Sequence, residues 1–182
     1  KHAAGLKAAL AEGLYGDLDE ETVDSVLVEA GRFASEVIAP LNRVGDKFGT
    51  PFKDGAVTTP PGWKDAYTAW AAAGWNGLAA PAEWGGQELP LALNAACIEM
   101  WNSGSMAFGI GPALTMAGVD ALAAYGTSAL KRQYLGKLVS GWAAWGQGLN
   151  RLSIGIGMIP RGEVGLIFAQ IGLASGVIDG PL

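Results

Sequence analysis

Residues 74–87 read Gly-Trp-Asn-Gly-Leu-Ala-Ala-Pro-Ala-Glu-Trp-Gly-Gly-Gln, and residues 125–135 read Tyr-Gly-Thr-Ser-Ala-Leu-Lys-Arg-Gln-Tyr-Leu. In the first stretch Gly and Pro interrupt regular structure, which predicts a rigid loop between two helices. In the second, Gly126 follows a long apolar segment, and Thr127 stands where the N-cap of a new amphipathic helix belongs. The two stretches together predict a fold built from helices.

The residues before this loop predict further helices. A short helix is expected over Leu6–Leu14, and Asp17, with Glu20 three residues later, has the pattern of a capping box. The next helix should weaken or end at Pro40. Its apolar residues recur at helical spacing, at Val23, Val26, Leu27, Ala30, Phe33, Ala34, Val37 and Ile38.

A charged connection is expected over residues 42–59, with a turn at Lys53-Asp54-Gly55. A helix over residues 62–73 follows Pro60-Pro61 and ends at Gly74. Its buried face should hold Trp63, Ala66, Tyr67 and Trp70.

After the loop, one helix should start at Pro90, and Gly104 should separate it from a second helix over residues 106–125. This second helix is apolar enough to suggest a membrane span, but Asp120 lies inside it, so we interpret it as a central buried helix. The last helix should bury Leu130, Tyr134, Leu135 and Leu138. The predicted fold class is therefore all-α, an antiparallel bundle of five or six helices with an apolar C-terminal helical tail.

Composition excludes several kinds of site. The formal net charge is −5 and no basic stripe is present, which argues against a nucleic-acid partner. The single cysteine, Cys97, cannot form a disulfide within the chain and is typical of a reducing compartment, so we expect a cytoplasmic location. With only His2 as histidine, neither a histidine-based triad nor a multi-histidine metal site is possible. We therefore expect no catalytic and no metal-binding residues, and no segment has the pattern of a cofactor-binding loop.

Three segments together resemble one enzyme family. They are residues 36–42 (Glu-Val-Ile-Ala-Pro-Leu-Asn), the loop 74–86, and residues 125–138, which begin Tyr-Gly-Thr. In this order and at these separations they resemble the N-terminal helical domain of the acyl-CoA dehydrogenases, over about residues 17–141. The resemblance implies α,β-dehydrogenation of a fatty acyl-CoA with FAD as cofactor, in an enzyme that forms homo-oligomers.

In the family, the helix that matches residues 106–115 lines the acyl channel. The resemblance therefore gives Phe108, Gly109, Gly111 and Leu114 as candidate channel residues. Small residues on an apolar helix leave a groove that an alkyl chain can fill. The alternative is that the glycines only permit close helix packing.

The resemblance stops after Trp142. A dehydrogenase continues with a segment similar to Leu-Thr-Glu-Pro-x-Ala-Gly-Ser-Asp, but residues 143–150 read Ala-Ala-Trp-Gly-Gln-Gly-Leu-Asn. Residues 151–178 instead resemble a segment of bacterial cation:proton antiporters, through Gly-Met-Ile-Pro-Arg-Gly-Glu-Val at 157–164. We expect two parts, residues 1–141 and an unrelated Gly-rich apolar tail at 142–182.

Because the flavin-binding β-domain and the catalytic carboxylate of the family are missing, we expect this chain to be inactive alone and to bind no cofactor. Its first residue is Lys1, which we interpret as the start of a piece of a longer protein. Two alternatives stay open: a remnant of a membrane cation:proton antiporter that acts through the tail, and a non-catalytic helical interaction module. Removing the residues after Gly141 should cost little stability.

Overall fold

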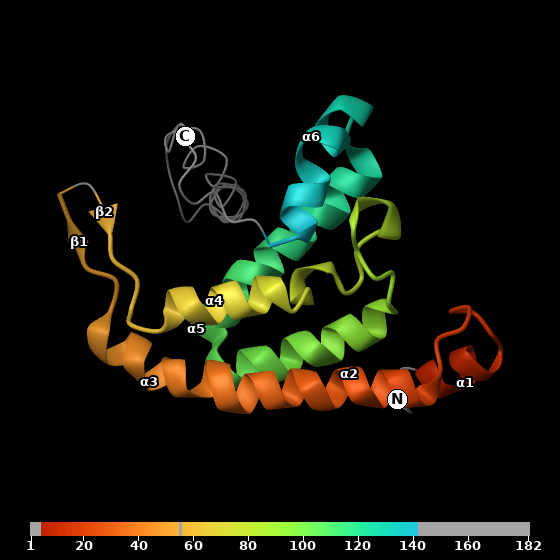
Figure 1. The fold of residues 1–182 in the computed structure, drawn as a ribbon, viewed down its shortest axis with the longest axis horizontal. Coiled ribbons are helices and arrows are strands. Elements are labelled where there is room, and N and C mark those ends of the chain that lie inside the picture. The colour runs from red at the N-terminus through yellow and green to blue at the C-terminus, as the bar shows by residue number, and fades with distance from the viewer. Residues whose placement is uncertain (1–4, 55, 142–182) are drawn as a thin grey trace, which may run out of the picture. The chain divides into compact units, whose positions relative to one another are not determined.

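The computed structural model describes residues 5–54 and 56–141, and these residues confirm the all-α fold class (Figure 1). The expected helical tail lies outside the described residues. The six α-helices of the described part are α1 (Leu6–Ala11), α2 (Glu20–Phe33), α3 (Ala39–Phe48), α4 (Trp63–Ala72), α5 (Leu91–Tyr125) and α6 (Ser128–Val139). Short elements join them: the π-helix η1 (Ala34–Ile38), the strands β1 (Phe52–Lys53) and β2 (Ala56–Val57), and the 3-10 helices η2 (Trp75–Gly77) and η3 (Ala82–Trp84).

Helix α2 begins two residues later than a cap at Asp17 would place it. The side chain of Asp19, not that of Asp17, accepts a hydrogen bond from the Thr22 amide at 2.7 Å and so caps the helix. This bond holds the pKa of Asp19 below its usual value, because an ionised carboxylate accepts the amide hydrogen better. The helix therefore starts where a carboxylate reaches its first free amides.

Of the two outcomes predicted at Pro40, that the helix weakens or that it ends, the second is wrong. Elements α2, η1 and α3 follow one another without a break and form one long rod, from Glu20 to Phe48 (Figure 1). A proline inside a helix clashes with the carbonyl four residues earlier. Here η1, a widened π turn, ends at Ile38, two residues before Pro40. Pro40 itself lies in the first turn of α3, where its missing amide hydrogen costs nothing.

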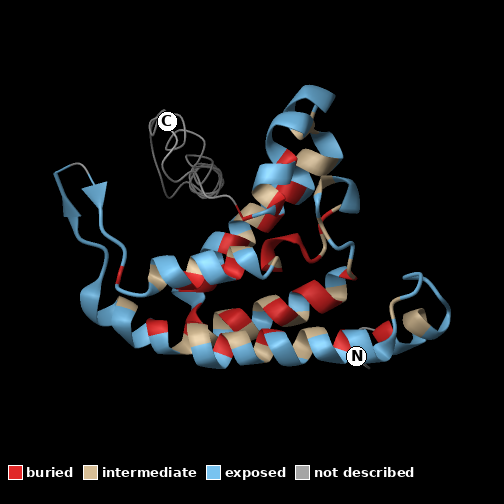
Figure 2. Cartoon of the chain, in the orientation of Figure 1, coloured by how far each residue is buried: buried red, intermediate tan, exposed pale blue. Residues whose placement is uncertain are grey.

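The expected connection over residues 42–59 is therefore shorter and starts at Gly49. Its turn at Lys53-Asp54 is confirmed, because β1 and β2 pair antiparallel around it with Phe52 opposite Val57. Both strands are exposed on all residues described (Figure 2).

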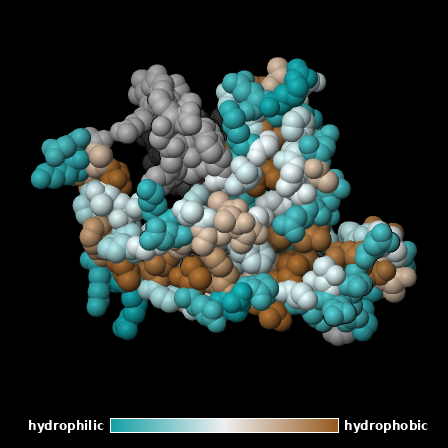
Figure 3. All heavy atoms as spheres, viewed as in Figure 1, coloured by the Kyte–Doolittle hydropathy of each residue, from teal (hydrophilic) through white to brown (hydrophobic). Residues whose placement is uncertain are grey.

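The main core lies between the rod, α4 and the first half of α5. Three tryptophans meet there: Trp70 of α4, Trp75 of η2 and Trp101 of α5, each with less than a tenth of its surface exposed. The apolar side chains fill the band between α4 and the rod, where brown atoms gather in Figure 3. The predicted buried face of α4 is confirmed, since Ala66 and Trp70 are buried and Trp63 and Tyr67 are partly buried.

The loop 74–89 is fixed by its own backbone. Gly74 ends α4 in the left-handed conformation predicted for it, with φ 74°. Amides of residues 87 and 89 donate back to the carbonyls of Gly77 and Leu78, both at 2.8 Å. Gly86 packs so closely that a Cβ there would lie 2.0 Å from the carbonyl oxygen of Ala80. Only glycine fits this approach, so Gly86 is a steric requirement of the loop.

Helix α5 consists of two halves joined by a break. Ser105 has extended backbone angles (φ −160°, ψ 107°), one residue after the predicted separator Gly104. The Ser105 hydroxyl donates to Asn42 Oδ1 at 3.3 Å, which ties the break to α3. The first half packs against the rod, and the second half turns away to pair with α6 (Figure 1). The Thr127 cap of α6 is confirmed, because its hydroxyl accepts from the Leu130 amide.

Expectations about burial in this region were wrong for two residues of α6 and for the second half of α5. In α6, Leu135 is buried and Leu138 is partly buried as expected, and Val139 is buried beside them, whereas Leu130 and Tyr134 are exposed. The second half of α5 is not a central helix: it is buried on one face only. By length and composition alone α5 could cross a membrane, but the break at Ser105 divides it into two shorter segments that contact other helices.

Candidate functional site

The candidate site is the uncovered side of the second half of α5. Met106, Ile110 and Leu114 lie four residues apart, so they share one side of the helix, and all three are exposed. Small exposed residues continue this side: Ala107, Gly111, Ala117, Gly118 and Ala121. We call these eight residues the open face of α5. Three large apolar side chains in a row on one helix, rather than singly, are typical of a surface that binds another molecule.

The opposite side of the same half-helix is its packing face. Phe108, Pro112, Met116 and Val119 recur at helical spacing there and are buried. Since both sides are apolar in sequence, periodicity could not separate them.

The four predicted channel residues divide between these two sides. Phe108 packs in the core, with its ring 5.9 Å from those of Trp63 and Trp70. Gly109 lies under the side chain of Asn102, since a Cβ there would be 2.6 Å from Asn102 Oδ1. Gly111 and Leu114 both belong to the open face, and a Cβ on Gly111 would meet nothing within 4 Å. The structure thus brings Gly111 and Leu114 together and keeps Phe108 and Gly109 apart from them.

Sequence reasoning missed Met106 and Ile110. Met106, Ile110 and Leu114 follow one another at four-residue spacing, which places them on one side of the helix. The spacing alone could not show whether that side is buried or exposed.

The open face carries almost no charge. Asp120 is the one charged residue between Met106 and Tyr125, and it is exposed near the far end of the face. Such a surface suits an alkyl chain or an apolar side chain better than a phosphate or a polar peptide.

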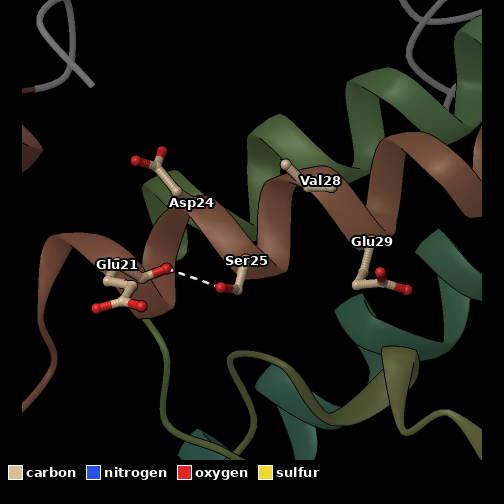
Figure 4. A pocket seen from close by; sticks show the side chains of 5 residues that line it. All are labelled: Glu21, Asp24, Ser25, Val28 and Glu29. Carbon is tan, nitrogen blue, oxygen red and sulfur yellow. Dashed lines mark hydrogen bonds between the residues drawn. The ribbon is translucent and has the colours of Figure 1, made fainter.

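Ionisable groups elsewhere in the described residues do not form a second chemical site. A hollow on α2 is lined by Glu21, Asp24, Ser25, Val28 and Glu29 (Figure 4). There the Ser25 hydroxyl donates to the Glu21 carbonyl within the helix, at 2.9 Å, and Glu29 pairs with Arg32. No group of three or more His, Cys, Asp or Glu side chains suited to a metal occurs in the described part of the chain.

The fold is an all-α domain, and the second half of its longest described helix, α5, has an uncovered apolar side. A family model, "Acyl-CoA dehydrogenase, N-terminal domain", matches residues 20–142. The chain belongs to this family, which confirms the resemblance inferred from the loop and the Tyr-Gly-Thr segment.

Two relatives of known name are similar to parts of the chain. A 3-methylmercaptopropionyl-CoA dehydrogenase of Ruegeria pomeroyi is 42% identical over 127 residues, which is 70% of this chain and 22% of that protein. A high-affinity Na(+)/H(+) antiporter of Synechocystis sp. is 59% identical over 46 residues, which is 25% of this chain and 10% of that protein. The chain thus spans about a fifth of the dehydrogenase and a tenth of the antiporter.

Proposed function

We propose that residues 5–141 are the N-terminal helical domain of a flavin-dependent acyl-CoA dehydrogenase and that the open face of α5 forms one wall of its acyl channel. The observation that carries this proposal is the uncovered apolar row Met106, Ile110 and Leu114 on a helix of this family. In the whole enzyme the substrate would be a fatty acyl-CoA and the enzyme a cytoplasmic homo-oligomer.

Within the wall, side-chain size sets the shape of the groove. Ile110 and Leu114 project from the helix, while Ala107, Gly111 and Gly118 leave the backbone low between and beside them. An alkyl chain laid along the small residues would bury apolar surface at roughly 25 cal/mol per Å². Phe108 supports this wall from behind through its contacts with Trp63 and Trp70.

The described residues do not fit a flavin by themselves. The open face offers hydrocarbon side chains, and the one charged residue of its half-helix is Asp120, whose carboxylate repels a pyrophosphate. Removing a hydride and a proton from an acyl thioester also needs an acceptor and a base in fixed positions. We therefore expect this chain alone to be catalytically silent.

The expected lack of catalytic activity is tested on the purified chain. We expect no flavin absorbance and no dye reduction on adding fatty acyl-CoA. Reduction of dye above the buffer rate would contradict the proposal that activity needs the remainder of a dehydrogenase.

The channel wall is tested by nuclear magnetic resonance with a nitroxide-labelled fatty acyl-CoA. Broadening is expected for the methyl signals of Met106, Ile110 and Leu114. Leu114→Ser should reduce this broadening, whereas Leu130→Ser should leave it unchanged, because Leu130 is similarly exposed (42% against 48%) but lies on α6. Broadening centred on Leu130 or on the β1–β2 hairpin would overturn the assignment of the wall.

A second proposal concerns residues 142–182, which we infer have a separate origin. The family match ends at residue 142, and a short match to an antiporter accompanies it. The open reading frame on both sides of Trp142 tests this directly: a β-domain sequence recovered after a one-base shift would show that the tail is an artefact of the reading frame and would overturn a separate origin. If the tail instead acts as part of an antiporter, the protein should require detergent for extraction from membranes.

A further inference from the structure

A small cavity lies where the loop after α4 meets both halves of α5. Its wall includes Asn76 of η2, Asn94 of the first half of α5, and Met116 and Asp120 of the second half. The cavity measures about 10 Å³. A space of roughly 10–15 Å³ is enough for one water molecule.

The two asparagines of this wall are buried and lack ordinary partners. Asn76 is 3% exposed and Asn94 is 6% exposed. Among the described residues, both amide atoms of Asn76 and the oxygen of Asn94 have no hydrogen-bond partner. The nitrogen of Asn94 has only the sulfur of Met116, at 4.0 Å. A buried amide without a hydrogen-bond partner destabilises the fold, because it has lost its hydrogen bonds to water. Such atoms therefore indicate a bound polar group.

Tyr67 is the neighbouring side chain that could act as a hydrogen-bond partner of Asn76. Burial raises the pKa of Tyr67, and the neighbouring amide of Asn76 opposes this rise. The Tyr67 hydroxyl, however, donates to the carbonyl of Gly141 at 3.0 Å, and no hydrogen bond of normal geometry joins it to Asn76. The asparagine is thus close to the hydroxyl without being satisfied by it.

We propose that the cavity binds one ordered water molecule that bridges the amides of Asn76 and Asn94. A water supplies two donors and two acceptors, so it can serve both carbonyl oxygens at once. The bridge joins the loop to the first half of α5 at the point where Met116 brings in the second half. It therefore holds η2 against the first half of α5, and this is so whether or not the open face is an acyl-channel wall.

A crystal structure of the full chain tests the site directly. We expect density for one water within about 2.7–3.2 Å of both side-chain amides. An empty cavity, or an Asn76 amide rotated to bond the Tyr67 hydroxyl with no water present, would overturn the proposal.

Thermal unfolding tests the water site independently, because Asn94→Leu should change the unfolding midpoint in opposite directions with and without a bound water. If water bridges the amides, Asn94→Leu removes a satisfied hydrogen bond and lowers the unfolding midpoint. If the cavity is dry, the same change replaces an unpartnered amide by an apolar group of similar size and raises the midpoint.

The double variant Asn76→Leu/Asn94→Leu completes the comparison. Since either single change breaks the same bridge, the midpoint loss of the double variant should be smaller than the sum of the two single losses. Gln133→Leu, the same kind of change at an exposed position of α6, should leave the midpoint nearly unchanged. A midpoint raised by Asn94→Leu would overturn the proposed water site. If the leucine variants do not fold, the crystal structure of the unaltered chain decides.

Discussion

The tryptophans of the core show how single side chains decide the packing. Trp101 stands edge-on to two others, with ring centroids 4.3 Å from Trp70 and 5.2 Å from Trp75. In this arrangement the positive edge of one ring meets the negative face of another. None of the three indole N–H groups has an acceptor among the described residues. Ring–ring contact, rather than hydrogen bonding, therefore holds the loop, α4 and α5 together.

Cys97 lies in the same core and is completely buried. Burial raises the pKa of its thiol to about 11, because the apolar surroundings disfavour the thiolate. We expect a disulfide reagent at pH 8 to modify Cys97 very slowly in the folded chain and at once in denaturant, as followed by released chromophore.

The raised pKa also predicts a pH dependence of stability. Well below pH 9, the ordinary pKa of the thiol, it is protonated in both the folded and the unfolded chain, so its contribution does not change. Between about pH 9 and about pH 11 the unfolded thiol loses its proton while the folded one keeps it, so the free energy of unfolding should fall as pH rises. Cys97→Ala should show a smaller fall, and equal slopes for the two proteins would contradict the prediction.

At the scale of elements, the geometry of α5 depends on where its glycines lie. Gly104 touches η1: a Cβ there would be 2.9 Å from the carbonyl oxygen of Ala34 and 3.3 Å from Ile38. Gly118 is exposed, with nothing within 4 Å of the same position. One glycine is therefore required for packing of α5 on the rod, and the other only weakens the helix.

Alanine at these two positions should have opposite effects. Gly104→Ala should lower the free energy of unfolding by about 1–3 kcal/mol, because the added methyl pushes α5 off η1. Gly118→Ala should raise it by roughly 0.5–1 kcal/mol, because alanine restricts the unfolded chain. Urea unfolding curves of both variants measure these free energies of unfolding. If both substitutions changed the free energy in the same direction, the close packing of α5 on η1 would be wrong.

At the scale of the whole molecule, the described bundle closes at residues 139–141. Val139 is buried with Leu135, Val119 and Ala80 in a second small core. Gly141 follows in the left-handed conformation, with φ 70°, and its carbonyl accepts from Tyr67. The last residues of the described part thus belong to the packed domain, whatever the origin of the segment after them.

Truncation tests where the domain ends. A stop directly after Gly141 would leave a charged carboxylate at a buried position, so the stop is better placed after Gln147. We expect this shortened chain to keep its helical circular dichroism and its unfolding midpoint, and to be more soluble.

A stop after Leu138 is the matched comparison. It removes the buried Val139 side chain, worth about 1.5–3 kcal/mol, together with the partner of Tyr67. This variant should unfold at a clearly lower temperature. Loss of helical structure already in the chain that ends at Gln147 would mean that residues 148–182 are part of the core, against the proposal of two origins.

The sequence by itself determined what depends on neighbouring residues along the chain. Thr127 caps α6 and Gly74 ends α4 because capping and left-handed turns are local properties of the backbone. The family, too, could be inferred from short segments, since their loops require particular residues such as Gly86. Of the four channel residues predicted from the family, two, Gly111 and Leu114, lie among the eight residues of the open face.

Only the tertiary structure decided how these elements face one another. Pro40 sits inside a continuous rod because a π turn precedes it, which no local signal predicted. The two sides of residues 106–125 are equally apolar, so only the position of the neighbouring helices separates buried Phe108 from exposed Met106 and Ile110. The physical reason is that burial is a property of a pair of surfaces, whereas a sequence pattern describes only one of them.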